Sequence, residues 1–241
     1  MSLRNSSKRP RPVLLGHRGT RGNKSIAENT LASFDQALAD GCDGFEFDVR
    51  LTLDEEAVVC HDPKSGSVVI GRTRASALCD LPSLSEVLQR YRSSAFLDIE
   101  IKVAGLENIV FEGMRRHKPT RGFVISSFLP QVLRRLHGLD PHLPLGLICE
   151  KQSQLKLWEN SPAGFLILHY GLVQKKLIDS VKDAGKKIFV WTVNNEKMMK
   201  ELADWKVDGI ISDHTQMLAS VLGDQHGKLK GHRQTIHGVV D

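Results

Sequence analysis

The fold of this chain is decided by Phe45-Glu46-Phe47-Asp48-Val49 and by a similar stretch at Leu97-Asp98-Ile99-Glu100-Ile101-Lys102. Both stretches alternate apolar with charged residues, which is the period of a β-strand and sends the two sets of side chains to opposite faces. The carboxylates of the first stretch then share one face, and Asp98, Glu100 and Lys102 share one face of the second. Alternation alone also fits a strand with one solvated face, so the rest of the chain has to decide between the two interpretations.

Strand and helix patterns alternate along the whole chain. The expected strands are Val13–Gly16, Asp43–Val49, Ala95–Lys102, Phe123–Ser126, Leu145–Cys149, Gly164–Leu168, Lys187–Thr192 and Gly209–Ser212. Helical patterns separate them, and a short β-hairpin over Leu51–His61 follows the second strand. Parallel βαβ units are typical of such alternation, and eight units predict an α/β protein with a closed (βα)8 TIM barrel.

An open, doubly wound sheet is the alternative fold. Its phosphate-binding glycine fingerprint is absent, because Gly16-His17-Arg18-Gly19 has the wrong spacing. The barrel is therefore favoured, and its parallel strands face water on neither side. Charged residues in such strands are costly unless they are paired or bind a metal.

Length and charge define three parts of the chain. The 241 residues are enough for one large core. We expect a basic N-terminal extension at residues 1–12, one barrel domain at 13–222 and a polar C-terminal tail at 223–241. The net charge of +5 comes from the two ends, since 13–222 holds 26 basic and 26 acidic residues. A neutral body argues against a nucleic-acid partner.

The remaining composition predicts a cytoplasmic protein. No stretch approaches the apolar length of a membrane span, and the N-terminal residues contain no apolar segment of a secretory signal. The four cysteines have neither paired nor metal-type spacing, so reduced thiols are the simplest expectation. We expect no membrane insertion, and the sequence leaves the oligomeric state open.

The barrel makes a specific prediction about polar residues, because active sites of such barrels lie at the C-terminal ends of the strands. The first three strands and the hairpin bring to that mouth His17, Arg18, Glu46, Asp48, His61, Glu100 and Lys102. Three converging carboxylates repel one another unless a hard cation lies between them. An all-oxygen ligand set fits Mg²⁺ or Ca²⁺ better than zinc.

The other groups at this mouth suit a phosphate ester. Arg18 binds an anion through paired hydrogen bonds, and Lys102 does so as a point charge. Histidines titrate near neutrality, so His17 and His61 are natural partners as general acid and general base. A metal site, a phosphate clamp and a histidine pair together predict metal-assisted hydrolysis of a phosphodiester.

Further motifs accompany these residues in a fixed order. They are His17-Arg18-Gly19, Glu28-Asn29-Thr30, Glu46-Phe47-Asp48-Val49, His61-Asp62-Pro63, Pro82-Ser83-Leu84-Ser85-Glu86-Val87-Leu88, Glu100-Ile101-Lys102 and Trp191-Thr192-Val193-Asn194. In this order they resemble the glycerophosphodiester phosphodiesterase family over nearly the whole body of the chain. The resemblance implies a (βα)8 barrel that uses one divalent cation, Mg²⁺ or Ca²⁺, to hydrolyse glycerophosphodiesters to glycerol 3-phosphate and an alcohol.

The resemblance also implies a role for each site residue. His17 and His61 would be the catalytic acid–base pair, and Glu46, Asp48 and Glu100 would hold the metal. Arg18 and Lys102 would bind the phosphate, and Trp191 would lie beside the glycerol. We add His169 to the substrate-binding set because it follows the sixth strand and could line the mouth. Glu28 and Asn29 are expected to brace the first loop and to cap the helix that begins at Leu31. Glu150 and Asp213 are expected to make local hydrogen bonds.

The chain departs from the family pattern at several places, and the short segment after His61-Asp62-Pro63 concerns substrate range. Ala27 replaces the usual proline before Glu-Asn-Thr, and only Lys64–Leu81 occupies a region where many members carry a larger insertion over the mouth. The alcohol side of this site is therefore expected to be open.

Two other functions remain as alternatives. A phospholipase-like phosphodiesterase acting on lipid is disfavoured by the polar mouth. A catalytically silent barrel that only binds phosphodiesters is disfavoured by the presence of both His17 and His61.

Overall fold

A closed barrel of eight parallel strands forms the body of the protein in the computed structural model, which describes residues 11–223. Its strands are β1 (Val13–Gly16), β2 (Gly44–Leu51), β6 (Phe96–Ile101), β7 (Phe123–Ser127), β8 (Leu145–Cys149), β9 (Phe165–His169), β10 (Lys187–Trp191) and β11 (Gly209–Ser212). Pairing of β1 with both β2 and β11 closes the ring. The expected basic extension, apart from its last two residues, and the tail beyond residue 223 lie outside the described residues.

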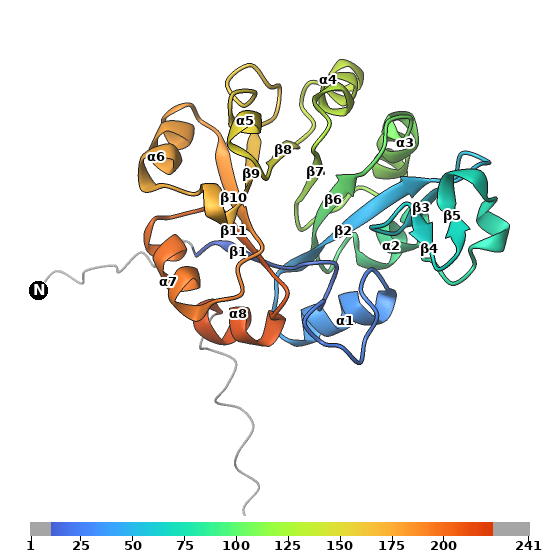
Figure 1. The fold of residues 1–241 in the computed structure, drawn as a ribbon, viewed down its shortest axis with the longest axis horizontal. Coiled ribbons are helices and arrows are strands. Elements are labelled where there is room, and N and C mark those ends of the chain that lie inside the picture. Colours follow the sequence, from blue (N-terminus) through green and yellow to red (C-terminus); the bar gives the residue numbers. More distant parts are fainter. Residues whose placement is uncertain (1–10, 224–241) are drawn as a thin grey trace, which may run out of the picture.

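Eight α-helices of the described chain surround these strands (Figure 1). They are α1 (Leu31–Ala39), α2 (Leu84–Tyr91), α3 (Glu107–Arg116), α4 (Pro130–Leu139), α5 (Gln152–Leu155), α6 (Lys175–Asp183), α7 (Glu196–Asp204) and α8 (Thr215–Leu222). The predicted (βα)8 TIM barrel is thus confirmed. Within residues 11–223 no helix has the length and apolar character needed to cross a membrane.

Pairing of β2 with β6 places the charged residues of the two deciding stretches side by side. In this parallel register Glu46 lies opposite Asp98, and Asp48 lies opposite Glu100. Because side chains alternate along a strand, these four carboxyl groups point to the same face of the sheet. The apolar residues between them point to the opposite face, toward the helices.

The core has two layers. The larger layer lies between strands and helices, where Phe34 of α1 stacks on Phe45 of β2 with ring centroids 4.1 Å apart, and Tyr91 of α2 meets Phe45 edge-on at 5.0 Å. The smaller layer fills the barrel interior with Leu15, Val124, Ile148, Phe165, Ile167, Phe189 and Ile211. Polar side chains of the interior therefore lie above an apolar floor, since Ile148, Ile167 and Ile211 also line the cavity described below.

The predicted hairpin after the second strand is present, and it lengthens that strand. β2 continues past Val49 to Leu51 and returns as β3 (Ala57–Val59), with Val49 paired to Val59 and Leu51 paired to Ala57. The antiparallel partner extends β2 beyond the predicted end. His61 follows β3 closely, so the hairpin returns this residue to the barrel mouth.

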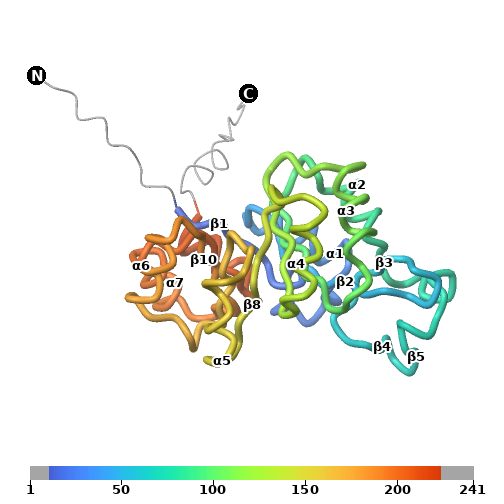
Figure 2. Tube along the Cα trace, turned by 90° about the horizontal axis from the view of Figure 1, so that it is seen from above, coloured from blue at the N-terminus to red at the C-terminus, as the bar shows by residue number. Residues whose placement is uncertain are grey.

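Residues 64–81, expected to be irregular, contain short regular pieces. These are β4 (Lys64–Ser65), β5 (Val68–Val69), η1 (Ile70–Arg72) and η2 (Ala75–Ala77). Ile70 and Leu78 are buried with Val58 in a small separate cluster, which anchors the segment to the hairpin. Figure 2 shows β4 and β5 at the end of the molecule opposite α6 and α7. Two-residue strands are too short to leave a periodic pattern in the sequence.

The stacked aromatic cluster gives a stability prediction. Replacing Phe34 by alanine should lower the free energy of unfolding by about 3–5 kcal/mol, because it removes a fully buried ring and leaves a cavity between α1 and β2. Urea unfolding followed by circular dichroism measures this change. The matched control is Leu53→Ala, whose side chain is 57% exposed and should change the free energy by about 0.5 kcal/mol or less. Similar effects of both substitutions would contradict the assigned packing.

Candidate active site

A cavity of about 300 Å³ opens at the C-terminal ends of the barrel strands. It is lined by His17, Arg18, Glu46, His61, Asp98, Glu100, Lys102, Ser126, Phe128, Ile148, Glu150, Ile167, Trp191 and Ile211. The structure thus brings together most of the residues predicted for the site. Asp48 is almost fully buried beneath the lining, and His169 is not part of the lining.

Glu46, Asp48 and Glu100 form a compact set of oxygen donors. One carboxylate oxygen from each lies within 4.8 Å of the others. The buried Oε1 of Glu46 has no hydrogen-bond partner. Asp48 Oδ1 and Glu100 Oε1 face the ammonium of Lys102, at 3.2 and 2.6 Å respectively. An unpartnered buried oxygen next to two carboxylate oxygens that meet one positive charge fits a hard divalent cation, so these residues could hold one.

Crowding of carboxyl groups in the barrel interior makes their charge costly. Burial, together with the charges of Asp48 and Glu100, raises the pKa of Glu46 well above its usual range. Burial and the charge of Asp48 raise the pKa of Glu100 to about 7. Burial also raises the pKa of Asp98 to about 7, although Ser126 donates a hydrogen bond to it. The metal-free cluster therefore retains protons near neutral pH.

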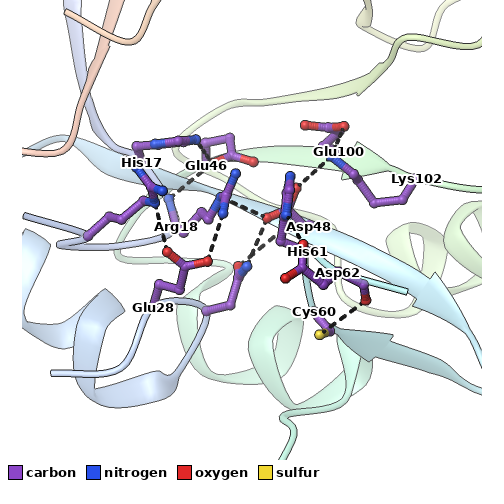
Figure 3. A network of polar contacts seen from close by, with 12 residues as sticks. His17, Arg18, Glu28, Glu46, Asp48, Cys60, His61, Asp62, Glu100 and Lys102 are labelled. Carbon is purple, nitrogen blue, oxygen red and sulfur yellow. Dashed lines mark hydrogen bonds and ion pairs between the residues drawn. The ribbon is translucent and has the colours of Figure 1, made fainter. Parts of the chain in front are cut away.

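Asp48 differs from these carboxyl groups because it has positive partners. Burial opposes its ionisation, but Lys102 and Arg18 outweigh burial and lower its pKa. Arg18 Nε lies 3.3 Å from Asp48 Oδ2, and Asn29 Nδ2 donates to the same oxygen at 2.8 Å. Burial likewise opposes the charge of Arg18, while Asp48 and Glu46 raise its pKa. The carboxylates likewise raise the pKa of Lys102 against the effect of burial, so both cations remain charged. Figure 3 shows Arg18 and Lys102 close to Asp48.

The loop that carries Arg18 is held in an unusual backbone conformation. Arg18 has φ of +50° and Asn29 has φ of +58°, both in the left-handed region. Gly19 has φ of +84°, and a Cβ there would lie 2.3 Å from Ser33 Oγ, so only glycine fits. Thr30 caps α1 by accepting from Ser33 N, which leaves the Asn29 side chain for Asp48. Glu28 braces the loop by accepting from Arg18 at 2.7 Å and from Arg21 at 2.8 Å.

Each of the two histidines has its Nδ1 within hydrogen-bond distance of a carboxylate. His17 Nδ1 lies 2.7 Å from Asp213 Oδ1, and His17 Nε2 lies 3.9 Å from Glu46 Oε2. His61 Nδ1 lies 2.7 Å from Asp62 Oδ1. Burial lowers the pKa of His61 despite the neighbouring charge of Asp48. In Figure 3 His17 lies beside Glu46 and His61 lies beside Asp48, so the pair flanks the carboxylates.

Two aromatic rings also line the cavity. Trp191, the last residue of β10, meets Phe128 edge-on at 5.8 Å. His169 packs edge-on against Trp191 at 5.5 Å and accepts a hydrogen bond from Gly171 N at 3.2 Å. The structure therefore places His169 against Trp191, outside the cavity lining.

Several site residues were not included in the sequence-based set. Asp98, Phe128 and Glu150 line the cavity, Asn29 contacts a donor carboxylate, and Asp62 and Asp213 contact the histidines. Asp213 directly follows β11, and this position at a strand end was the sequence signal that could have assigned it to the site. Burial opposes the ionisation of Asp213, but hydrogen bonds to His17 and Asn194 outweigh it and lower the pKa, so this carboxyl group is ionised at neutral pH.

Sequence comparison and structure comparison point to the same protein family. The model of the glycerophosphoryl diester phosphodiesterase family matches residues 17–85 and 75–217. A glycerophosphodiester phosphodiesterase of Bacillus altitudinis is 30% identical over 83% of this chain and 94% of its own length. One from Caldanaerobacter subterraneus is 28% identical over 87% of this chain and 97% of its own length.

A solved structure adds a ligand to this comparison. A phosphodiesterase of Oleispira antarctica, in complex with the product sn-glycerol-3-phosphate, has a TM-score of 0.77 and 25% sequence identity. The alignment covers 88% of this chain and 96% of that protein. Its ligand contains the phosphate and glycerol groups that the predicted reaction releases.

Proton retention by the carboxylate cluster predicts that metal binding releases protons. Folding raises the carboxyl pKa values from about 4 to near 7, so the metal-free fold loses stability as the pH rises through that interval. A bound cation must displace these protons, and its affinity should fall roughly three- to tenfold between pH 7 and pH 6. Titration calorimetry with Mg²⁺ or Ca²⁺ in two buffers of different ionisation enthalpy measures the protons released.

The exposed Glu159→Gln variant is the matched control and should leave the proton release unchanged. An affinity that is constant between pH 6 and pH 8, without proton release, would contradict the assigned donor set.

Proposed function

The chain belongs to the glycerophosphoryl diester phosphodiesterase family and is a phosphodiesterase, and from this premise we propose that it hydrolyses glycerophosphodiesters to glycerol 3-phosphate and an alcohol. One observation carries the proposal. Two histidines, two cations and two of the three donor carboxylates line a single cavity, and the third carboxylate, Asp48, contacts both cations. The product bound by the Oleispira antarctica relative supports the same reaction.

We assign one divalent cation, Mg²⁺ or Ca²⁺, to Glu46, Asp48 and Glu100. When bound, such an ion polarises the phosphoryl oxygen and orients the substrate. The unpartnered Oε1 of Glu46 and the two oxygens that meet only Lys102 support this donor set. All three donors are oxygens, which favours the two hard cations over zinc.

Arg18 and Lys102 hold the phosphate in this proposal. Both side chains line the cavity and contact Asp48, so their charges lie at the border between the donor set and the open space. A phosphodiester anion entering the cavity meets two fixed positive charges at the edge of the carboxylate cluster. This arrangement orients the phosphorus and balances the charge that develops on its oxygens during the reaction.

His17 and His61 carry the two proton transfers. The Nδ1 atom of each ring faces a carboxylate, which leaves Nε2 of each ring for the substrate. One ring takes the proton from the attacking oxygen nucleophile, and the other gives a proton to the departing alcohol. The His17 side chain is 10% exposed and the His61 side chain is 34% exposed, so the His61 ring is the more accessible to solvent.

Recognition of the substrate rests on its glycerophosphate half. Trp191 lines the cavity with Phe128, where it can pack against the glycerol, and His169 packs edge-on against the indole. None of residues 64–81 lines the cavity, and Ile70 and Leu78 of this segment are buried in a separate small cluster. The departing alcohol therefore meets few side chains.

The histidine pair predicts a bell-shaped pH dependence of kcat/KM for glycerophosphocholine hydrolysis. His17→Gln and His61→Gln should each lower kcat by roughly 10²-fold or more, the usual scale of general acid–base catalysis. The exposed His142→Gln variant is the control and should keep the parent rate. A double variant without both rings that still turned over near the parent rate would refute the assignment.

Recognition of the glycerophosphate half predicts tolerance of the alcohol. Glycerophosphodiesters of choline, ethanolamine and glycerol should have kcat/KM values within about tenfold of one another, since tenfold corresponds to only ~1.4 kcal/mol. An alkyl phosphocholine of similar length, without the glycerol hydroxyls, should be much poorer. Equal rates for it would indicate a generic phosphodiesterase, and a preference for lysophospholipid in vesicles would select the phospholipase-like alternative.

A further inference from the structure

We propose that Asp213 and Asn194 form a positioning pair that fixes His17 in the tautomer with its proton on Nδ1. Asp213 follows β11 and Asn194 lies just beyond β10, and neither lines the cavity. The inference rests on the proposed role of His17 in proton transfer and assigns the residues that orient it. Its first experimental readout is independent of catalysis.

The contact between ring and carboxylate sets the tautomer. Asp213 Oδ1 lies 2.7 Å from His17 Nδ1, within hydrogen-bond distance, and an ionised carboxylate can only accept. The neutral imidazole must therefore carry its proton on Nδ1. Its Nε2 is then an unprotonated acceptor, and this atom faces the donor set, 3.9 Å from Glu46 Oε2.

Asn194 determines how Asp213 presents its oxygens. Asn194 Oδ1 accepts from the backbone N of Asp213 at 2.9 Å and from Ser212 Oγ at 3.0 Å. Those two donors fix the amide orientation, so Asn194 Nδ2 must face Asp213, where it donates to Oδ2 at 2.6 Å. One oxygen of the carboxylate is held by the amide, and the other remains for His17.

The other histidine has no such support in the described structure. Asp62 is the chain neighbour of His61, and its side chain is 74% exposed, whereas the side chain of Asp213 is 13% exposed. Arg21 Nη1 adds a positive charge 3.5 Å from the same Asp213 oxygen that faces His17. The orientation of His17 is thus determined by a relay, a half-buried carboxylate that an exposed amide holds in place, which is the arrangement expected for a group whose free nitrogen must be held at a defined place.

The relay predicts an unusual effect of Asp213→Asn. Asn194 still presents a donor, so the new amide must turn its oxygen toward Asn194 and its NH₂ group toward His17. Nδ1 then has to accept, and the proton moves to Nε2. Long-range ¹H–¹⁵N spectra of histidine-labelled full-length protein report which ring nitrogen carries the proton. The His17 signal is identified by its loss in His17→Gln.

The double variant Asp213→Asn with Asn194→Asp tests the direction of the relay. A carboxylate at position 194 accepts from the NH₂ group of the amide introduced at position 213, so the amide oxygen turns back to His17 and the Nδ1 proton returns. We expect the Nδ1–H tautomer in the parent and in the double variant, and the Nε2–H tautomer in the single variant. Asp204→Asn, at an exposed carboxylate at the end of α7, should leave the tautomer unchanged.

Kinetics provide the second readout. The single variant should lower kcat by about 10²- to 10⁴-fold with KM within a few-fold, and the double variant should recover at least tenfold of that loss. An Nε2–H tautomer in the parent protein contradicts the proposal without any variant. An Nδ1–H tautomer that persists in the Asp213→Asn variant also contradicts the proposal, provided that thermal unfolding shows this variant to be folded. If the tautomers change as expected but the parent hydrolyses no glycerophosphodiester, the positioning pair stands and the proposed substrate fails.

Discussion

Repulsion between buried carboxylates is the constraint on which this structure depends. The pairing of β2 with β6 sets Glu46, Asp48, Asp98 and Glu100 on one face inside a closed barrel, where water cannot spread their charge. Only three kinds of partner can offset that repulsion: protons, fixed cations or a metal ion. Burial favours the first by raising the pKa values of Glu46, Glu100 and Asp98, and the ion pairs of Asp48 with Arg18 and Lys102 provide the second.

The residues that stabilise the fold are not the residues of the carboxylate cluster. Apolar residues of the same strands point outward and pack against the helices, as Phe45 does against Phe34, so core packing does not depend on the interior charges. An apolar floor inside the barrel closes the site from below. Catalytic groups can therefore be held in an unfavourable arrangement by a scaffold that is stabilised elsewhere, which is a common property of enzyme sites.

Much of this arrangement follows from local sequence patterns. Period-2 alternation places Glu46 with Asp48 and Asp98 with Glu100, and the rule that barrel sites lie at strand ends brings His17 and Lys102 to the same mouth. Residues 64–81 escaped prediction because their strands are too short to show a period. The relay to His17 escaped it because Asp213 is 196 residues away in the chain, and ring closure between β1 and β11 alone makes them neighbours. His169 was placed at the mouth from its strand, but the local turn directs its ring against Trp191.

The central claim is that the carboxylate cluster holds a divalent cation needed for hydrolysis of glycerophosphodiesters. The most direct test measures glycerophosphocholine hydrolysis by the full chain after exhaustive chelation, and again after Mg²⁺ or Ca²⁺ is returned, with Glu46→Gln in parallel. The account predicts loss of turnover on chelation, recovery with one of the two ions, and a higher ion requirement in the folded Glu46→Gln protein. Full turnover in excess chelator, by protein shown to contain no bound metal, would contradict it.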